Sequence, residues 1–144
     1  MSFSVHLTYC GQCEAALRFY QRCFDGTFAT SVTMLRYGES PMAAQVPDDW
    51  RDKIVHASLR IGHATLAAAD VQPKDYQPPR GFFVLLDIED ASSAERVFHA
   101  LAEHGTVAMP LQETFWARRF GVLTDQFGIP WEINSGASSA SSQR

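Results

Sequence analysis

The chain has 144 residues, of which 46% are hydrophobic and 19% are charged, and its formal net charge is −4 at pH 7. This length predicts one compact domain or two very small halves, and the apolar fraction is ample for a core. The mild charge and scattered basic residues exclude a nucleic-acid-binding footprint. No apolar run is long enough to cross a bilayer. Residues 1–9 lack the layout of a signal peptide, so we expect a cytoplasmic protein.

The first half of the chain is predicted to contain one helix and four strands. Residues 3–9 alternate between apolar and polar, which predicts a half-buried strand. A helical apolar stripe follows over 12–24 and ends at Asp25-Gly26. Further strands are predicted at 28–37, 54–61 and 64–69. The proline-rich residues 71–80 then form the predicted boundary between the halves.

The second half repeats this order of elements. A strand is predicted over 81–88, and a helix over 91–104 is closed by Gly105. Further strands are predicted at 106–111, 118–124 and 129–134. Each half therefore reads as a strand, a helix and three strands, which predicts an α+β fold of two βαβββ modules. The modules are expected at about 1–72 and 79–134, and the small polar residues 135–144 are expected to be a disordered tail.

The last predicted hairpin carries the side chain of greatest chemical interest. A turn at 125–128 joins its two strands. In the second strand Trp131 and Ile133 share one face, while Glu132 and Asn134 share the other. An apolar back and a polar front are typical of a curved sheet that packs a helix behind and faces a cavity in front. From the residues alone, Glu132 is either a carboxylate on a solvated face or a functional cavity residue.

Two histidines and an arginine are further candidates for the site. His56 and Arg60 alternate with apolar residues over 54–61, so we expect both to face the cavity side of a sheet. His6 lies on the polar face of the strand at 3–9. An ordinary hydrogen-bonded histidine is the alternative for His6 and for His56.

An aromatic and basic run, Phe115 to Phe120, is another candidate site element. Trp116 offers stacking area, and Arg118 offers bidentate recognition of a carboxylate or a phosphate. The alternative is a loop packed over the mouth of the cavity with its arginines on the rim.

The three cysteines, Cys10, Cys13 and Cys23, argue against a disulfide framework because their number is odd and no signal peptide is evident. Cys10 and Cys13 form a CxxC motif at a predicted strand-to-helix junction, which is the layout of a thioredoxin-type site. The strands that follow read as antiparallel meanders, so we expect no redox role. One cysteine is expected to cap the helix and the other to be buried in its first turn. No second pair completes a zinc site.

Several motifs resemble the PhnB-like branch of the vicinal oxygen chelate superfamily, which includes glyoxalase I, fosfomycin-resistance enzymes, extradiol dioxygenases and bleomycin-binding proteins. The clearest is the stretch at 111–134, LQETFWARRFGVLTDQFGIPWEIN. The segments FY…FDG at 19–26, YGESP at 37–41 and HA…RIG at 56–62 are similar to further family motifs. The resemblance covers 5–134 and implies two modules paired edge to edge around a shared cavity. A homodimer is also implied, because members of the family commonly pair through apolar sheet edges.

The resemblance also implies where metal ligands would lie. In metal-dependent members, four ligands come from the first and last strands of each module. The matching positions here are Ser4 or Val5 with His6 nearby, then Ala67, Phe82 and Glu132. Ala67 and Phe82 have no donor atoms, and a catalytic divalent site usually needs about three protein ligands. We therefore expect no tightly bound cofactor, with a weak divalent site at His6 and Glu132 as the alternative.

His56 does not complete this ligand set. The strand order that the resemblance implies for the first module is 1-4-3-2. His56 then lies two strands from His6, roughly 9–10 Å across the sheet. One ion cannot easily bridge that gap, so His56 is predicted to be a residue of the cavity wall.

Three hypotheses for the function follow. The first is a PhnB-like protein that binds a small polar or aromatic molecule in the cavity between its modules. Its candidate binding residues are His56, Arg60, Phe82, Trp116 and Arg118. A phosphonate-related ligand is suggested only by the PhnB resemblance, and no glycine-rich nucleotide loop supports the methyltransferase label that some relatives carry. The second is a metal-dependent lyase, isomerase or dioxygenase that uses His6 and Glu132. The third is a non-enzymatic binder that sequesters a toxic compound.

Overall fold

The computed structural model describes residues 1–136 and divides the chain into two compact units. The first unit is Met1–Gln77, and the second begins at Pro78, inside the proline-rich connector. Each unit is one βαβββ module, which confirms the predicted fold class. Neither helix among the described residues is long and apolar enough to span a membrane.

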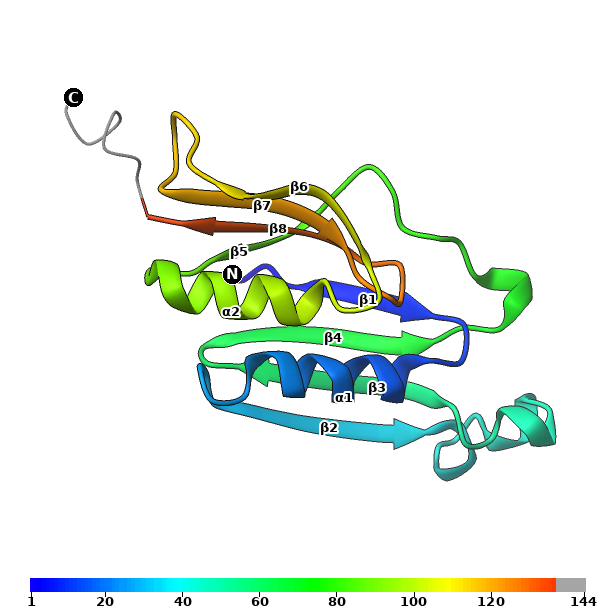
Figure 1. Cartoon of the computed structure of the whole chain (residues 1–144). Helices are drawn as coiled ribbons and strands as arrows, with labels where there is room; N and C mark the ends of the chain where they lie inside the picture. Colours follow the sequence, from blue (N-terminus) through cyan, green and yellow to red (C-terminus); the bar gives the residue numbers. More distant parts are fainter. Residues whose placement is uncertain (137–144) are drawn as a thin grey trace. The chain divides into compact units, whose positions relative to one another are not determined.

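The first unit contains a mixed four-stranded sheet in the order β1-β4-β3-β2 (Figure 1). Its elements are β1 (Val5–Tyr9), α1 (Cys13–Phe24), β2 (Thr30–Arg36), β3 (Ile54–Ile61) and β4 (Ala64–Asp70). The 3₁₀ turns η1 (Tyr37–Glu39), η2 (Ala43–Gln45) and η3 (Asp48–Trp50) join β2 to β3, and η4 (Pro73–Asp75) follows β4. β1 pairs with β4 in parallel, while the other pairs are antiparallel. This is the predicted order 1-4-3-2.

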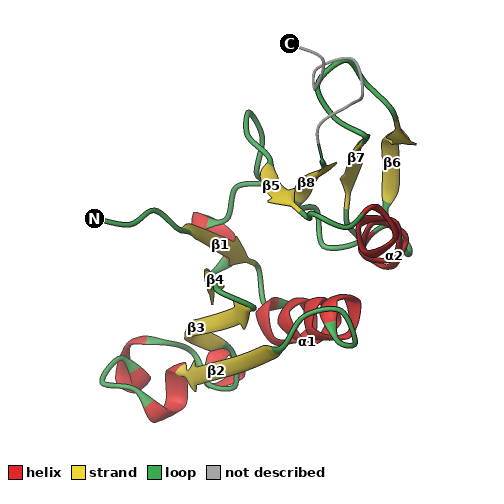
Figure 2. Ribbon diagram, turned by 90° about the vertical axis from the view of Figure 1, so that its left-hand side faces the viewer, coloured by secondary structure: helices red, strands yellow, loops and turns green. Residues whose placement is uncertain are grey.

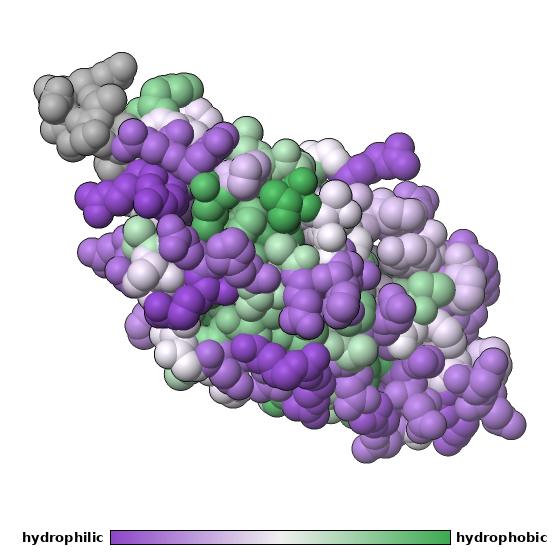
Figure 3. Space-filling view, in the orientation of Figure 1, coloured by the Kyte–Doolittle hydropathy of each residue, from purple (hydrophilic) through white to green (hydrophobic). Residues whose placement is uncertain are grey.

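Helix α1 forms because its apolar side chains recur at helical spacing and pack on the sheet. Its buried residues are Cys13, Ala16, Leu17, Phe19, Tyr20, Cys23 and Phe24. At the centre of this packing the hydroxyls of Tyr9 and Tyr20 lie 3.0 Å apart in a hydrogen bond. The outer face of the helix carries exposed Arg18 and Arg22, and hydrophilic side chains cover it in Figure 3.

A buried carboxylate at the end of β4 joins three segments of the first unit. The Asp70 side chain accepts hydrogen bonds from the backbone N–H groups of Gly11, Cys13 and Ile54, each at 2.9 Å. The prediction that a cysteine caps α1 was therefore wrong, because Asp70 occupies that place. A carboxylate is favoured at the positive end of a helix, whereas a thiol is a weak acceptor. The second half of that prediction is confirmed, since Cys13 is fully buried in the first turn.

The second unit has the same topology, with the sheet order β5-β8-β7-β6 (Figure 2). Its elements are β5 (Val84–Asp87), α2 (Ala91–Leu101), β6 (Thr106–Gln112), β7 (Arg119–Thr124) and β8 (Pro130–Ser135). β5 pairs with β8 in parallel. The Asp90 side chain caps α2 by accepting a hydrogen bond from the Ser93 N–H at 2.9 Å.

Several boundaries in the second unit differ from the prediction. β5 begins at Val84 rather than at 81, because Gly81 has φ 82° and still belongs to the connector turn. α2 ends at Leu101, and His104 beyond it has φ 59°, a left-handed conformation that ends helices. Ser135 belongs to β8 rather than to a tail. Gly136 is also described, and the remainder of the predicted tail, 137–144, lies outside the described residues.

A second buried carboxylate orients the β7–β8 hairpin. Asp125 Oδ1 accepts from the backbone N–H groups of Phe127 and Ile129 at 2.8 and 3.0 Å, and its Oδ2 accepts from Trp131 Nε1 at 2.9 Å. Trp131 and Ile133 are fully buried on the helix side of the sheet, as predicted. The alternation of β8 then sends Glu132 to the opposite face.

We expect the Asp70→Asn substitution to destabilise the protein. An amide keeps the size of the carboxylate but must turn its NH₂ group toward one of the three backbone donors, which leaves that donor unpaired. The expected loss in free energy of unfolding is about 1–3 kcal/mol, measured by urea denaturation. Asp49→Asn, at an exposed position in the same unit, is the matched control. Equal stabilities for the two variants would contradict this role of Asp70.

Candidate functional site

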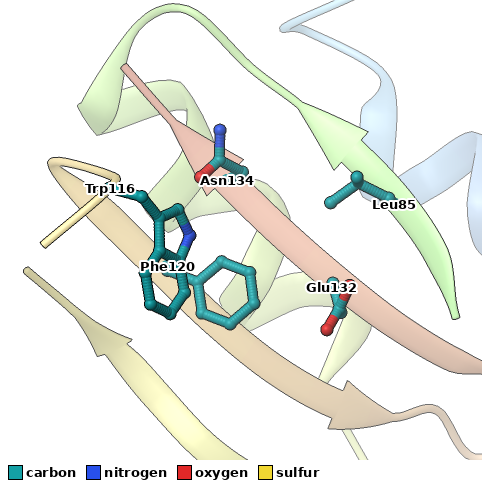
Figure 4. Close-up of a pocket in the computed structure, with 5 residues that line it drawn as sticks. All are labelled: Leu85, Trp116, Phe120, Glu132 and Asn134. Carbon is teal, nitrogen blue, oxygen red and sulfur yellow. The ribbon is translucent and has the colours of Figure 1, made fainter. Parts of the chain in front are cut away.

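The second unit carries an open pocket of about 390 Å³ on the sheet face opposite α2 (Figure 4). Its lining residues are Leu85, Trp116, Phe120, Glu132 and Asn134. Figure 4 shows Glu132 and Asn134 of the central strand β8 between two walls. One wall is aromatic and is made by Trp116 and Phe120, and the other is Leu85 of β5.

Strand register sets two rows of side chains across the pocket floor. In the first row Glu132 pairs with Leu85 on β5 and with Val122 on β7. In the second row Asn134 pairs with Asp87 on β5 and with Phe120 on β7. The same register that buries Trp131 therefore brings a carboxylate, an amide and an aromatic ring onto one face.

The side chain of Asn134 is oriented by its neighbour on β5. Its Nδ2 donates a hydrogen bond to Asp87 Oδ1 at 3.1 Å. Because a carboxylate oxygen only accepts, the amide nitrogen must face Asp87 and the amide oxygen must face away. That Oδ1 atom is buried and has no hydrogen-bond partner among the described residues.

The aromatic wall is built by a short loop before β7. The rings of Trp116 and Phe120 meet edge to face, with centroids 5.1 Å apart and planes at 71°. The loop is closed by backbone and side-chain bonds between Thr114 and Ala117, including Ala117 N–H to Thr114 Oγ1 at 3.1 Å. Ala117 is fully buried, whereas Trp116 is 43% exposed. The loop is thus anchored at Ala117 and holds an accessible indole over the sheet.

The other predicted residues of the second unit lie apart from this pocket. Arg118 is exposed and does not line it. The Arg119 guanidinium forms an ion pair with Glu95 of α2, Nε to Oε1 at 3.2 Å, and so lies on the helix side. Phe82 precedes β5 and does not line the pocket either. The position beside Glu132 is instead Leu85.

The first unit places its candidate residues on a polar sheet face. His6 pairs with Ala67, which pairs with Ser58, which in turn pairs with Thr33. The hydroxyls of Thr33 and Ser58 lie 2.9 Å apart in a hydrogen bond. This row therefore offers hydroxyls and one imidazole across the four strands.

His56 and Arg60 lie on the same face of β3 as Ser58, one to each side of it, and both are exposed. His56 lies two strands away from β1, as predicted. Arg60 Nε donates to the Gly62 carbonyl at 3.4 Å.

Sequence reasoning identified Glu132 and Trp116 but overlooked Leu85 and Phe120 as neighbours of Glu132. Alternation along 118–124 carried the signal for Phe120, since it shares a strand face with Val122. Leu85 carried no such signal, because the family resemblance matches Phe82 to the ligand position of this strand, whereas the strand pairing sets Leu85 beside Glu132.

Comparison with known proteins places this fold in a family. A model of the Glyoxalase/Bleomycin resistance protein/Dioxygenase superfamily matches residues 4–133. The chain therefore belongs to this superfamily, which confirms the resemblance seen in the sequence.

Individual relatives match nearly the whole chain. Protein YjdN of Escherichia coli (strain K12) is 34% identical over 145 residues, which cover 93% of this chain and 95% of that protein. The crystal structure of protein PA1353 from Pseudomonas aeruginosa is 38% identical and has a TM-score of 0.78, covering 95% of this chain and 100% of that one. A PhnB protein from Bacillus cereus, 22% identical with a TM-score of 0.73, covers 94% of this chain and 100% of its own and shares the fold.

The donor atoms of this chain do not fit the four-ligand metal site that the superfamily implies. In the β1–β4 pairing His6, rather than Ser4 or Val5, lies beside Ala67. In the β5–β8 pairing Glu132 lies beside Leu85. Each unit thus offers one side chain that could bind a metal, and the residue paired with it has no donor atom. Within 1–136, no three His, Cys, Asp or Glu side chains form a group that could hold a metal ion.

The second cysteine of the CxxC motif lies where a thiolate is disfavoured. Burial, followed by the negative charges of Asp70 and Glu14, raises the pKa of Cys13 from 9.0 to about 12. A thiolate nucleophile requires a lowered pKa. The Cys13 thiol is therefore held neutral at physiological pH.

We expect Cys13 to resist alkylation by iodoacetamide at pH 8 in the native protein and to react readily in urea. Because its pKa is raised on folding, the folded state loses stability relative to the unfolded state as the pH rises from about 9 to 12. Mass spectrometry of peptides after timed alkylation measures the reaction. Rapid native labelling of Cys13 is the outcome that contradicts the neutral, buried thiol.

Proposed function

We propose that this protein binds a small molecule with a flat ring in the pocket of its second unit, without a tightly held metal. The observation that carries the proposal is the pairing of an aromatic wall, Trp116 and Phe120, with the polar floor of Glu132 and Asn134. The volume of about 390 Å³ lies in the range of small-molecule sites, which combine apolar walls with a few polar groups. Leu85 closes the opposite side as an apolar contact for the ring.

The two aromatic residues are suited to different tasks. Phe120 is 8% exposed and forms a fixed part of the wall. Trp116 also contacts the exposed ring of Phe115, but it is far more exposed than Phe120 and lies on a loop, so a ligand ring can cover its accessible part. Offset or edge-to-face contacts between aromatic rings contribute about 0.5–1.5 kcal/mol in addition to the free energy gained from the area that they bury. Trp116 is therefore the residue whose loss should weaken ring binding most.

The superfamily contains both enzymes and binding proteins, and the pocket favours the binding hypothesis. A metal-dependent lyase, isomerase or dioxygenase would need further donors beside His6 and Glu132, where Ala67 and Leu85 stand. A sequestering binder needs only shape and contacts. The PhnB-like placement supports neither alternative by itself, because the fold hosts many functions. A homodimer, a cytoplasmic location and a cavity shared by the modules stay predictions.

We expect the Trp116→Ala variant to lose ring binding. A panel of small aromatic compounds is screened against the wild type by thermal shift, and hits are measured by isothermal titration calorimetry. Affinity for each hit should fall about tenfold or more in the variant, because the ligand loses both the ring contact and the apolar area that Trp116 buries. Phe83→Ala, another exposed aromatic position of the second unit, is the matched control. If Phe83→Ala weakens binding as much as Trp116→Ala does, the pocket is not the site.

The protein purified without chelators is expected to hold well under one divalent ion per chain. Elemental analysis of the wild type and of Glu132→Ala measures this. Two donors cannot supply the three protein ligands that a tightly held ion usually needs. Near-stoichiometric zinc, nickel, manganese or iron that is lost in Glu132→Ala would restore the enzyme hypothesis.

A further inference from the structure

We propose that the pocket of the second unit selects ligands whose ring carries a cationic or hydrogen-bond-donating group, and that it rejects anions such as phosphonates. This inference rests on the proposed function and adds the chemical class of the ligand. It starts from the two polar groups of the floor, the carboxylate of Glu132 and the amide oxygen of Asn134.

The acceptor of Asn134 is assigned by geometry. One N–H of its amide donates to Asp87 Oδ1 at 3.1 Å, which turns the amide oxygen Oδ1 away from that carboxylate. This oxygen is buried and without a partner among the described residues. A buried acceptor left unpaired carries a desolvation penalty that a donating ligand group would remove.

Glu132 adds a charged acceptor one step along the same strand face. It is half-buried and lies in the row between Leu85 and Val122, neither of which can donate a side-chain hydrogen bond. No hydrogen bond or ion pair engages its side chain within 1–136. An ionised carboxylate accepts but cannot donate, so a polar ligand group that contacts Glu132 has to be a hydrogen-bond donor.

The charges around the pocket floor also favour a cationic ligand over an anionic one. None of the five lining residues is basic, and Asp87 places a second carboxylate beside Asn134. Of the two nearby arginines, Arg119 is paired with Glu95 on the helix side and Arg118 lies outside the lining. An anionic ligand would meet Glu132 without a compensating cation, whereas a cation would gain both that carboxylate and the face of Trp116.

These contacts define a ligand class: a flat ring with an ammonium, an amidinium or a ring N–H at one end. The ring lies against Trp116 and Phe120, and the donor reaches Glu132 and the oxygen of Asn134. We therefore do not expect this pocket to bind the phosphonate-related ligand that the family resemblance suggests.

Three probes that share one ring test the inference. They are 1-naphthylmethylamine, 1-naphthylmethanol and 1-naphthylmethylphosphonate, which are cationic, neutral and anionic at pH 7. Calorimetry on the full chain should rank their affinities in that order, with the amine about tenfold tighter than the alcohol, as for a charge-assisted hydrogen bond. Glu132→Gln keeps the size of the side chain and should remove most of this tenfold preference. Glu103→Gln, at an exposed position of the same unit, is the control for the loss of one negative charge and should retain it.

The outcomes separate the two proposals. If all three probes bind equally, or the phosphonate binds best, the ligand class is wrong while ring binding stands. If the amine preference persists in Glu132→Gln, Glu132 is not the selecting group and the inference fails. If no probe binds the wild type, or binding survives unchanged in Trp116→Ala, the proposed function fails with it.

Discussion

The pocket depends on one buried carboxylate, Asp125, at the turn between β7 and β8. Its three hydrogen bonds hold the turn and the indole of Trp131 together, and so determine which face of β8 packs against α2. Because side chains alternate along a strand, a register shift of one residue would bury Glu132 and Asn134 and expose Trp131 and Ile133. Asp70 performs a matching task at the end of β4 in the first unit, where it joins β3 and the start of α1.

The sequence predicted most of the fold because local patterns encode it. Alternation and helical spacing gave two βαβββ modules, and the face of β8 that carries Glu132 was evident from Trp131 and Ile133. The predictions that failed concern contacts between residues that are distant in the sequence. The cap of α1 comes from Asp70, about sixty positions away in the chain, and the neighbour of Glu132 depends on where β5 begins. A single sequence shows neither the partner of an unsatisfied backbone group nor the register between two strands.

Family membership explains the shape of the site better than its chemistry. The superfamily supplies two modules whose sheets each present one open face, and the positions where metal-dependent members hold their ions are easily located. In this chain the matching positions include Ala67 and Phe82, which have no donor atoms. The strand pairing sets Ala67 beside His6 and Leu85 beside Glu132, so each donor stands beside an apolar side chain. Glu132 therefore stands on the pocket floor as an acceptor without a second donor residue beside it. Under the proposed function, contacts with the aromatic wall supply most of the affinity.

The most direct test of this account follows the indole N–H signals of ¹⁵N-labelled protein during titration with 1-naphthylmethylamine. The chain has three tryptophans, and Trp116→Phe assigns the signal of the residue at the pocket. The account predicts that the Trp116 signal moves with ligand concentration. The Trp131 signal, held by Asp125 on the opposite face of the sheet, and the Trp50 signal in the first unit should stay in place. A moving Trp50 or Trp131 signal with an unchanged Trp116 signal would contradict the claim that this pocket is the binding site.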